Sequence, residues 1–325
     1  MKVERILIPT DFSENSLAAL KFASHFVDRF DTVVDLIHVI PIDAYFSVGF
    51  EGMTVPIDFQ KDVYPKVMEK AQEEMERLAS IYLRKGYRGD MIVSIGSNVY
   101  RAIMNQTEGQ DYDLILMSRK GANESHFLRG SSAEKVIRHS DVPVLTLDDD
   151  AFEKGFSNIV VPLDMSDISY SGIPLAFILA KEFDAQLTFH HVIEMYSTGI
   201  EGMAFVGPYS SREVAYASIL NKLKEFFNDN PEMGLSFEQK ASQNEGMLTW
   251  AKDAESVSIP VFIVVEEGVA AHHQIIDYAN EHADLLVMTT HGRTGLAKFF
   301  LGSTASQVVQ HVHKPMLTVK PNGLK

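Results

Sequence analysis

The chain contains the same order of segments twice. ILIPTDFSENS, which begins at Ile6, returns as IVVPLDMSDIS from Ile159, a shift of 153 positions. Further along, DLILM from Asp113 returns as DLLVM from Asp284. A repeat of this length is far longer than the units of solenoids and propellers, and it matches the size of a whole domain. We therefore predict two related domains, residues 1–150 and residues 151–325.

Composition places the chain among globular proteins. With 325 residues, of which 46% are hydrophobic, it can form two ordinary cores. It has no cysteine, which excludes disulfides, thiolate metal sites and a cysteine nucleophile. Its longest apolar runs, such as VFIVV from Val261, fall far short of the roughly 20 residues of a membrane-spanning helix, and no signal peptide is visible. We predict a cytoplasmic protein with no membrane partner.

Charge argues against one class of partner. The formal net charge is -15 at pH 7, and no basic stripe is visible along the chain. Binding to DNA or RNA depends on neutralising phosphates with lysine and arginine. We therefore predict no nucleic-acid partner.

Hydrophobic periodicity indicates alternating strands and helices in the first half. Continuous apolar runs at 6–9, 33–40, 113–117 and 142–147 are typical of strands buried on both faces, as in a parallel sheet. Ser13 is a suitable N-cap for a helix after the first strand, and 66–85 reads as a second amphipathic helix. Right-handed crossovers wind such a chain into an open α/β sheet, with ligands at the carboxyl ends of the strands.

The two halves differ in two places. The shift between them grows from 150 at Gly49 to 171 at Asp113, so the second half carries 21 additional residues. Most should lie in the polar segment 228–246, which we predict to be a surface loop or a short helical insertion, with a role in partner binding left open. Pro174 stands opposite Lys21, inside the predicted first helix, so the equivalent helix should begin late or kink there.

Five elements recur in the same order in both halves: a strand ending PxD, a strand ending HV, a DLIVM-like strand, a glycine-spaced loop and a final strand. This pattern resembles the universal stress protein family along essentially the whole chain, as a tandem pair. The resemblance implies a Rossmann-like open parallel five-stranded sheet in each half. It also implies that the halves pack as a pseudo-two-fold pair through their final strands. Many members hold ATP at a G-x2-G-x9-G-(S/T) loop, whereas others lack the loop and bind no nucleotide.

The second half nearly matches that loop. Thr289 occupies the first glycine position, Gly292 follows, and nine residues separate it from Gly302, Ser303 and Thr304. Glycines let the backbone approach phosphates, and a helix opening at Ser303 offers unpaired N–H groups. Thr289 should weaken or shift the ligand rather than forbid it. The alternative is that the glycines serve only turns and helix packing.

The first half departs further. Ser118 and Gly121 stand at the first two positions, but only eight residues separate Gly121 from Gly130, which Ser131 follows. A displacement on the order of 1 Å costs much of a well-placed contact. We therefore predict no adenine nucleotide in domain 1, whose site is degenerate or differently liganded. Three nearby basic residues could attract an anion or be solvated: Arg119, Lys120 and Arg129.

The strand-end carboxylates are the next candidates. By the resemblance, Asp164 would hydrogen-bond adenine or ribose, with Pro162 nearby and Val192 lining the base pocket. A carboxylate can accept from two vicinal hydroxyls. The alternative is that Asp164 caps the following helix, and both roles can coexist. The weaker counterparts in domain 1 are Pro9, Asp11 and Val39.

No catalytic or metal constellation is visible. The chain has no HExxH, no GxxxxGK(S/T) and no GxSxG, so we assign no catalytic residue and no metal ligand. His38 and His191, which repeat before the base-lining valine, are expected to be structural.

The resemblance implies a stress-response or signalling module that binds ATP or a related adenine nucleotide, with or without magnesium, mainly in domain 2. A nucleotide-free scaffold, or a binder of apolar, lipid-like ligands, is the alternative. A slow ATPase is the third, with Arg293 and Lys298 as its weak candidates. Protein partners are expected but not specified, and a homodimer of the tandem unit stays open.

Overall fold

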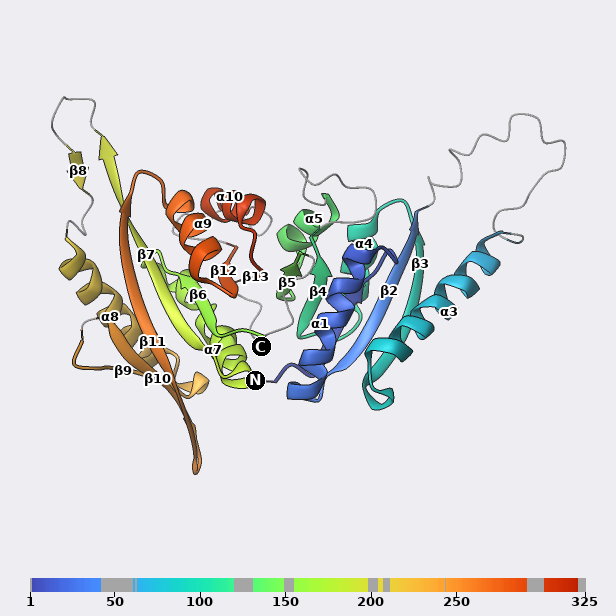
Figure 1. Ribbon diagram of the computed structural model, residues 1–325, viewed down its shortest axis with the longest axis horizontal. Helices are drawn as coiled ribbons and strands as arrows, with labels where there is room; N and C mark the ends of the chain where they lie inside the picture. Colours follow the sequence, from blue (N-terminus) through green and yellow to red (C-terminus); the bar gives the residue numbers. More distant parts are fainter. Residues whose placement is uncertain are drawn as a thin grey trace. The chain divides into compact units, whose positions relative to one another are not determined.

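The computed structural model describes residues 2–41, 61, 63–119, 131–148, 155–197, 204–206, 211–242, 244–290 and 301–320. The chain folds as two compact units, one over 2–150 and the other over 151–325 (Figure 1). We refer to them as domain 1 and domain 2 and describe each by itself. The packing of the halves as a pseudo-two-fold pair stays a prediction.

Domain 1 is an open parallel sheet with strands in the order β3-β2-β1-β4-β5. The predicted alternation of strands and helices is confirmed. Helix α1 packs with α3, and α4 packs with α5, as expected when right-handed crossovers lead outward from β1 in both directions. The elements are β1 (Arg5–Pro9), α1 (Glu14–Phe30), β2 (Val33–Pro41), α3 (Tyr64–Tyr82), β3 (Arg88–Gly96), α4 (Val99–Glu108), β4 (Leu114–Ser118), α5 (Ser131–His139) and β5 (Val144–Leu147).

Helix α1 shows how local sequence sets an element. The Ser13 hydroxyl accepts from the Ser16 N–H at 3.2 Å, which confirms the predicted N-cap. Leu20 and Phe26 bury one face of the helix against the sheet. Asp31 ends it in a left-handed conformation, φ 56°, and this turn leads directly into β2.

Domain 2 has the same parallel core with an antiparallel extension, in the order β13-β12-β6-β7-β11-β10-β9. A short strand, β8, pairs with β7 outside this order. The elements are β6 (Asn158–Pro162), α6 (Asp167–Tyr170), α7 (Ile173–Phe183), β7 (Gln186–Ser197), β8 (Ala204–Val206), α8 (Arg212–Asp229), β9 (Leu235–Gln239), β10 (Glu245–Lys252), β11 (Glu255–Gly268), α9 (Ala271–His282), β12 (Leu285–Thr289), α10 (Ser303–His311) and β13 (Met316–Val319).

The extension corrects two predictions. The segment 228–246 contains a short 3-10 helix, Pro231–Met233, as the prediction allowed, but it also contributes β9 and the start of β10, which were not predicted. The five parallel strands of domain 2 are therefore extended by antiparallel strands. Leu235 and Phe237 alternate with exposed residues and bury one face of β9, which packs against α8. Gly246 leaves room for Phe237, because a Cβ there would lie 2.3 Å from the Phe237 Cζ atom. Two apolar side chains in a polar segment predict a strand only weakly. Strand β9 forms because these side chains pack against α8.

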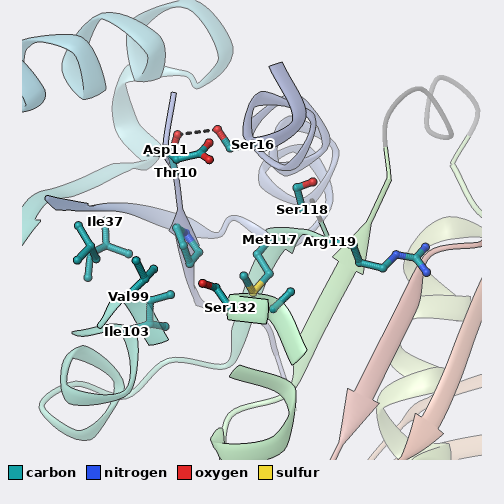
Figure 2. Close-up of a pocket in the computed structure, with 13 residues that line it drawn as sticks. Thr10, Asp11, Ser16, Ile37, Val99, Ile103, Met117, Ser118, Arg119 and Ser132 are labelled. Carbon is teal, nitrogen blue, oxygen red and sulfur yellow. Dashed lines mark hydrogen bonds between the residues drawn. The ribbon is translucent and has the colours of Figure 1, made fainter. Parts of the chain in front are cut away.

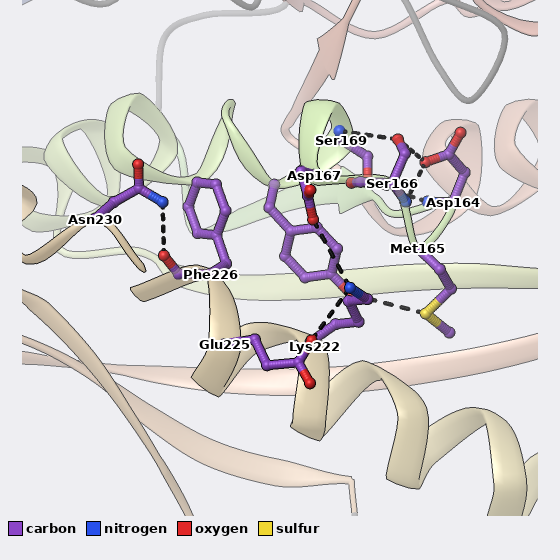
Figure 3. Close-up of polar contacts among 10 residues, drawn as sticks. Asp164, Met165, Ser166, Asp167, Ser169, Lys222, Glu225, Phe226 and Asn230 are labelled. Atoms are coloured by element: carbon purple, nitrogen blue, oxygen red, sulfur yellow. Dashed lines mark hydrogen bonds and ion pairs between the residues drawn. The ribbon is translucent and has the colours of Figure 1, made fainter. Parts of the chain in front are cut away.

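The prediction for Pro174 is confirmed. Helix α6 ends at Tyr170, and α7 begins at Ile173 with the proline in its first turn, where a missing N–H costs nothing. Helix α6 packs against α8, and Lys222 Nζ of α8 lies 3.9 Å from Asp167 Oδ1 of α6 (Figure 3). Among the described residues, no helix is both long enough and apolar enough to cross a bilayer.

Candidate ligand-binding site

The sheet order places a crevice in each domain. In domain 2, β6 lies between β7 and β12, and the chain leaves β6 toward one side and later returns to the other. This is the topological switch point at which open α/β sheets bind ligands. The parallel registers bring Asp164, Val192 and Thr290 to the same edge, beside the end of β6. Domain 1 repeats the arrangement around β1, with Asp11, Val39 and Ser118.

The strand-end carboxylate holds the N-cap serine of the following helix in both domains. Asp164 Oδ1 accepts from the Ser166 N–H at 3.0 Å and from the Ser166 hydroxyl at 2.5 Å, and Ser166 is the N-cap of α6 (Figure 3). Asp11 Oδ1 accepts from the Ser13 N–H at 3.1 Å in the same way. The carboxylates therefore support the helix start by holding the N-cap serine, so the capping alternative applies only through that serine. The binding role of Asp164 stays a prediction.

The residue after each carboxylate has an unusual backbone. Phe12 has φ 65° and Met165 has φ 67°, the left-handed region that side chains other than glycine seldom enter. Phe12 stacks on His38 at a centroid distance of 4.3 Å, and the Tyr170 hydroxyl contacts Met165 Sδ at 3.7 Å. A left-handed residue at this matching position gives both domains the same sharp turn from strand to N-cap. The turn lies at the edge where open α/β sheets bind ligands.

The repeated histidines fasten the first two strands of each sheet. His38 Nδ1 lies 2.8 Å from the Thr10 carbonyl oxygen, and His191 Nδ1 lies 2.7 Å from that of Leu163. A ring N–H donates to the carbonyl in both cases. Burial lowers the pKa of His38, so the neutral ring is favoured. These contacts agree with the structural role predicted for both histidines.

The start of α10 meets the end of β12. The Gly302 N–H donates to the Thr290 carbonyl at 2.9 Å, and Thr289 is buried. Gly302 is the N-cap of α10 and supplies no side-chain cap. Its φ is -55°, and a Cβ there would meet its nearest neighbour, the Thr290 carbonyl oxygen, at 3.6 Å, an ordinary contact. Neither the backbone nor the described surroundings of Gly302 require a glycine.

A cavity of about 150 Å³ opens in domain 1 at the carboxyl ends of β1, β2 and β4 (Figure 2). The apolar residues that line the cavity are Pro9, Ile37, Val39, Val99, Ile103, Met117 and Ala133. Its polar residues are Thr10, Asp11, Ser16, Ser118, Arg119 and Ser132.

Arg119 forms an ion pair within domain 1. Its Nη2 atom lies 3.2 Å from Asp148 Oδ2, and 3% of the Arg119 side chain is exposed. Burial lowers the pKa of Arg119, and the charge of Asp148 opposes this shift. In Figure 2 the guanidinium points away from Thr10, Asp11 and Ser16.

Sequence comparison identifies the family. The sequence model of the Universal stress protein family matches residues 2–147 and 155–320. The chain belongs to the universal stress protein family. Along its whole length it is similar to universal stress protein E of Photorhabdus laumondii, at 23% identity over 99% of this chain and 96% of the relative. A universal stress protein of Methanocaldococcus jannaschii is 32% identical over 169 residues, which cover 52% of this chain and 84% of that protein.

Structure comparison supports the fold. The crystal structure of a universal stress protein from Archaeoglobus fulgidus matches with a TM-score of 0.65 at 20% identity. The match covers 99% of this chain and 100% of the other. At this identity the likeness shows a shared tandem α/β fold, which agrees with the predicted Rossmann-like halves.

In domain 2, the predicted site residues that the structure describes form two groups. One lies at the ends of β6 and β12 and beside them in β7: Pro162, Asp164, Val192 and Thr289. The other begins α10: Gly302, Ser303 and Thr304. The contact between Gly302 and Thr290 joins the second group to β12. Gly292 lies outside the described residues, as do Arg293 and Lys298.

In domain 1, four of the predicted site residues line the same cavity: Pro9, Asp11, Val39 and Ser118. Gly121 and Gly130 lie outside the described residues, and Ser131 begins α5. No sequence motif marks the other residues that line the cavity, so they could not be predicted. They are Thr10, Ser16, Ile37, Val99, Ile103, Met117, Ser132 and Ala133. Among the described residues, no group of three or more histidine, aspartate or glutamate side chains is arranged to hold a metal ion.

Proposed function

We propose that domain 2 binds ATP or a related adenine nucleotide, and that the protein is a nucleotide-responsive stress or signalling module. The observation that carries this proposal is the glycine at the start of α10. Gly302 has an ordinary φ, and a Cβ there would make only an ordinary contact with the described residues, so the described part of domain 2 does not explain the absence of a side chain. Close approach of a phosphate does explain it.

The surrounding groups suit such a ligand. The first turn of α10 leaves N–H groups without intrahelical acceptors, and its dipole favours an anion. Ser303 is exposed and adds a hydroxyl donor. On the other side of the crevice, Asp164 offers an acceptor for ribose or adenine beside Pro162, and Val192 offers an apolar wall. The nucleoside would therefore lie against β6 and β7, and the phosphates against α10.

The decisive experiment is a titration of the Gly302→Val variant with ATP, with and without magnesium, by calorimetry. A branched side chain at this position should weaken binding at least tenfold, about 1.4 kcal/mol. Gly86→Val is the matched control, since a Cβ at Gly86 meets no atom within 4 Å. The equivalent change in the loop of domain 1, Gly130→Val, should alter ATP affinity much less.

Two outcomes would reverse the proposal. Equal losses in Gly302→Val and Gly130→Val, with both variants folded, would remove the difference between the domains. No binding of millimolar ATP by the wild-type protein would favour the scaffold or apolar-ligand alternative. Steady release of phosphate that a single substitution abolishes would support the third alternative, a slow ATPase.

A further inference from the structure

Strand β9 is the last strand of the domain 2 sheet, and among the described residues it pairs with β10 alone (Figure 1). It runs from Leu235 to Gln239 without a proline, a lysine or a bulge in its register with β10. Proteins commonly protect an exposed edge with such features, because unpaired N–H and C=O groups otherwise pair with another strand. The edge of β9 is therefore open to a further strand.

The hydrogen bonds to β10 show which backbone groups of β9 point outward. The Lys240 N–H donates to the Glu245 carbonyl at 2.9 Å, and the Ala251 N–H donates to the Gly234 carbonyl at 3.0 Å. In an antiparallel pair, residues that bond to the neighbouring strand alternate with residues that do not. The even-numbered residues of β9 therefore bond to β10. The N–H and C=O groups that point to the free edge are those of Leu235, Phe237 and Gln239.

The side chains of β9 leave these backbone groups accessible. A Cβ at Gly246 of β10 would lie 2.3 Å from Phe237 Cζ, so the Phe237 ring lies across β10 and away from the free edge. Leu235 is buried on the same face of the strand, where β9 packs against α8. On the opposite face, Ser236 and Glu238 are exposed.

The spacing of the outward groups fits a second copy of the same strand. In an antiparallel two-fold pair centred on Phe237, this residue lies opposite itself, and Leu235 lies opposite Gln239 of the second copy. The three outward residues of each copy then form hydrogen-bonded pairs, in which every outward N–H and C=O group has a partner. A two-fold interface uses the same patch on both copies, as this arrangement does.

The exposed face of β9 is complementary to itself in the same register. Ser236 lies opposite Glu238 of the second copy, twice by symmetry. In such non-hydrogen-bonded pairs the side chains lie close together, and a serine hydroxyl can donate to a carboxylate. The two Glu238 side chains are diagonal neighbours, about 7–8 Å apart, and both are exposed to water. Within the paired strands, no like charges therefore lie directly opposite each other.

We infer that the protein self-associates through β9, which pairs with β9 of a second copy and continues the domain 2 sheet across the interface. Main-chain hydrogen bonds supply the affinity, and one short strand buries little surface, so association is weak and depends on concentration. The net charge of -15 adds repulsion at low salt. The proposed nucleotide site lies at the ends of β6, β7 and β12, so the inference does not depend on that proposal.

A proline at Gln239 tests the backbone contact. The Gln239 N–H points to the free edge, so Gln239→Pro removes a donor of the interface and no bond to β10. Association is measured by sedimentation velocity over a concentration series in about 0.15 M salt, which screens charges beyond about 8 Å. Gln239→Pro should weaken association about tenfold or more, because each copy loses a hydrogen bond.

Gln239→Ala is the matched control, since it shortens the same side chain and keeps the N–H. It should associate like the wild type. A wild type that stays monomeric throughout the series would overturn the inference and leave the edge of β9 to a strand of another protein. Equal association of the two folded variants would also overturn it.

Opposite charges at Ser236 test the register. Ser236→Glu places a carboxylate opposite Glu238 of the second copy and should weaken association about threefold or more, whereas Ser236→Lys should strengthen it by a similar factor. Within one copy, the neighbour of Ser236 on β10 is the uncharged Thr249, so the fold accepts both variants. Glu238→Lys added to Ser236→Glu restores opposite charges across the interface and should restore association. Equal association of Ser236→Glu and Ser236→Lys would contradict the inference.

Cross-linking tests the same register without a charge change. The chain has no cysteine, so Ser236→Cys and Glu238→Cys each supply a single thiol. The two variants are mixed and treated with oxidised glutathione, and the mixture should form a disulfide dimer that contains one copy of each. Each variant alone should cross-link much less, because its two thiols are diagonal neighbours about 7–8 Å apart, beyond the reach of a disulfide. Equal cross-linking in the mixture and in the separate variants would overturn the inference.

Discussion

The buried His190 of β7 and the partly exposed Glu266 of β11 form a pair, with Nε2 and Oε2 2.8 Å apart. The His190 side chain is wholly buried and stacks on Tyr278 at a centroid distance of 4.6 Å. Burial lowers the pKa of His190, and Glu266 opposes that shift. The neighbouring His191 and His282 lower it further. The neutral imidazole is therefore the form that the fold stabilises.

We expect the stability of domain 2 to decrease as pH falls below about 6.5, the ordinary pKa of histidine. The unfolded chain then binds a proton that the folded histidine resists, so stability rises with pH in this window. Thermal unfolding measured between pH 5 and pH 8 should show this slope in the wild type. His190→Gln keeps a donor for Glu266 but cannot titrate, so its slope should be shallower. Identical slopes would exclude His190 as the cause.

We expect Asp148→Asn to destabilise domain 1 strongly. The substitution leaves the Arg119 charge buried without its carboxylate, and breaking such a pair costs about 3 kcal/mol or more. Denaturant unfolding measures the loss. Glu225→Gln, which breaks an exposed pair with Lys222, is the control and should cost less than about 1 kcal/mol. Similar losses in both variants would argue against the burial effect.

We expect Tyr112→Phe to lower stability by about 1.5–3 kcal/mol, as for a hydrogen bond to a charged group. The Tyr112 hydroxyl donates to the buried Asp35 carboxylate at 2.6 Å, and burial raises the pKa of Tyr112 so that the donor keeps its proton. Tyr87→Phe removes an exposed hydrogen bond to Asp31 and should leave the melting temperature nearly unchanged. Calorimetric unfolding of the two variants distinguishes the cases, and equal melting temperatures would contradict the prediction.

We expect Gly246→Ala to disturb the extension of the domain 2 sheet. The added methyl group would overlap the Phe237 ring, and overpacking of this kind costs about 1–3 kcal/mol. Hydrogen exchange should show faster exchange of the amides of β9 and β10. Gly86→Ala serves as the control, since its Cβ would meet no atom within 4 Å. Unchanged exchange in β9 would mean that Phe237 moves aside at little cost.

Much of the fold could be predicted because its signals are local. Ser13 caps α1 through atoms three residues away, and Pro174 forces a new helix start through its own missing N–H. The strands of the parallel core appear as continuous apolar runs because both their faces are buried. Strand β9 was missed because its two buried side chains, Leu235 and Phe237, depend on packing against α8. The sequence around β9 is otherwise polar.

The duplication, the α/β class and the family could be predicted from the order and spacing of residues alone. The positions of Asp11, Asp164 and Gly302 at element boundaries could be predicted in the same way. What surrounds these residues depends on the packing of the folded chain. Residues far apart in the chain become neighbours when parallel strands end at one edge, so the domain 1 cavity and the Arg119–Asp148 pair follow from packing rather than from any local pattern.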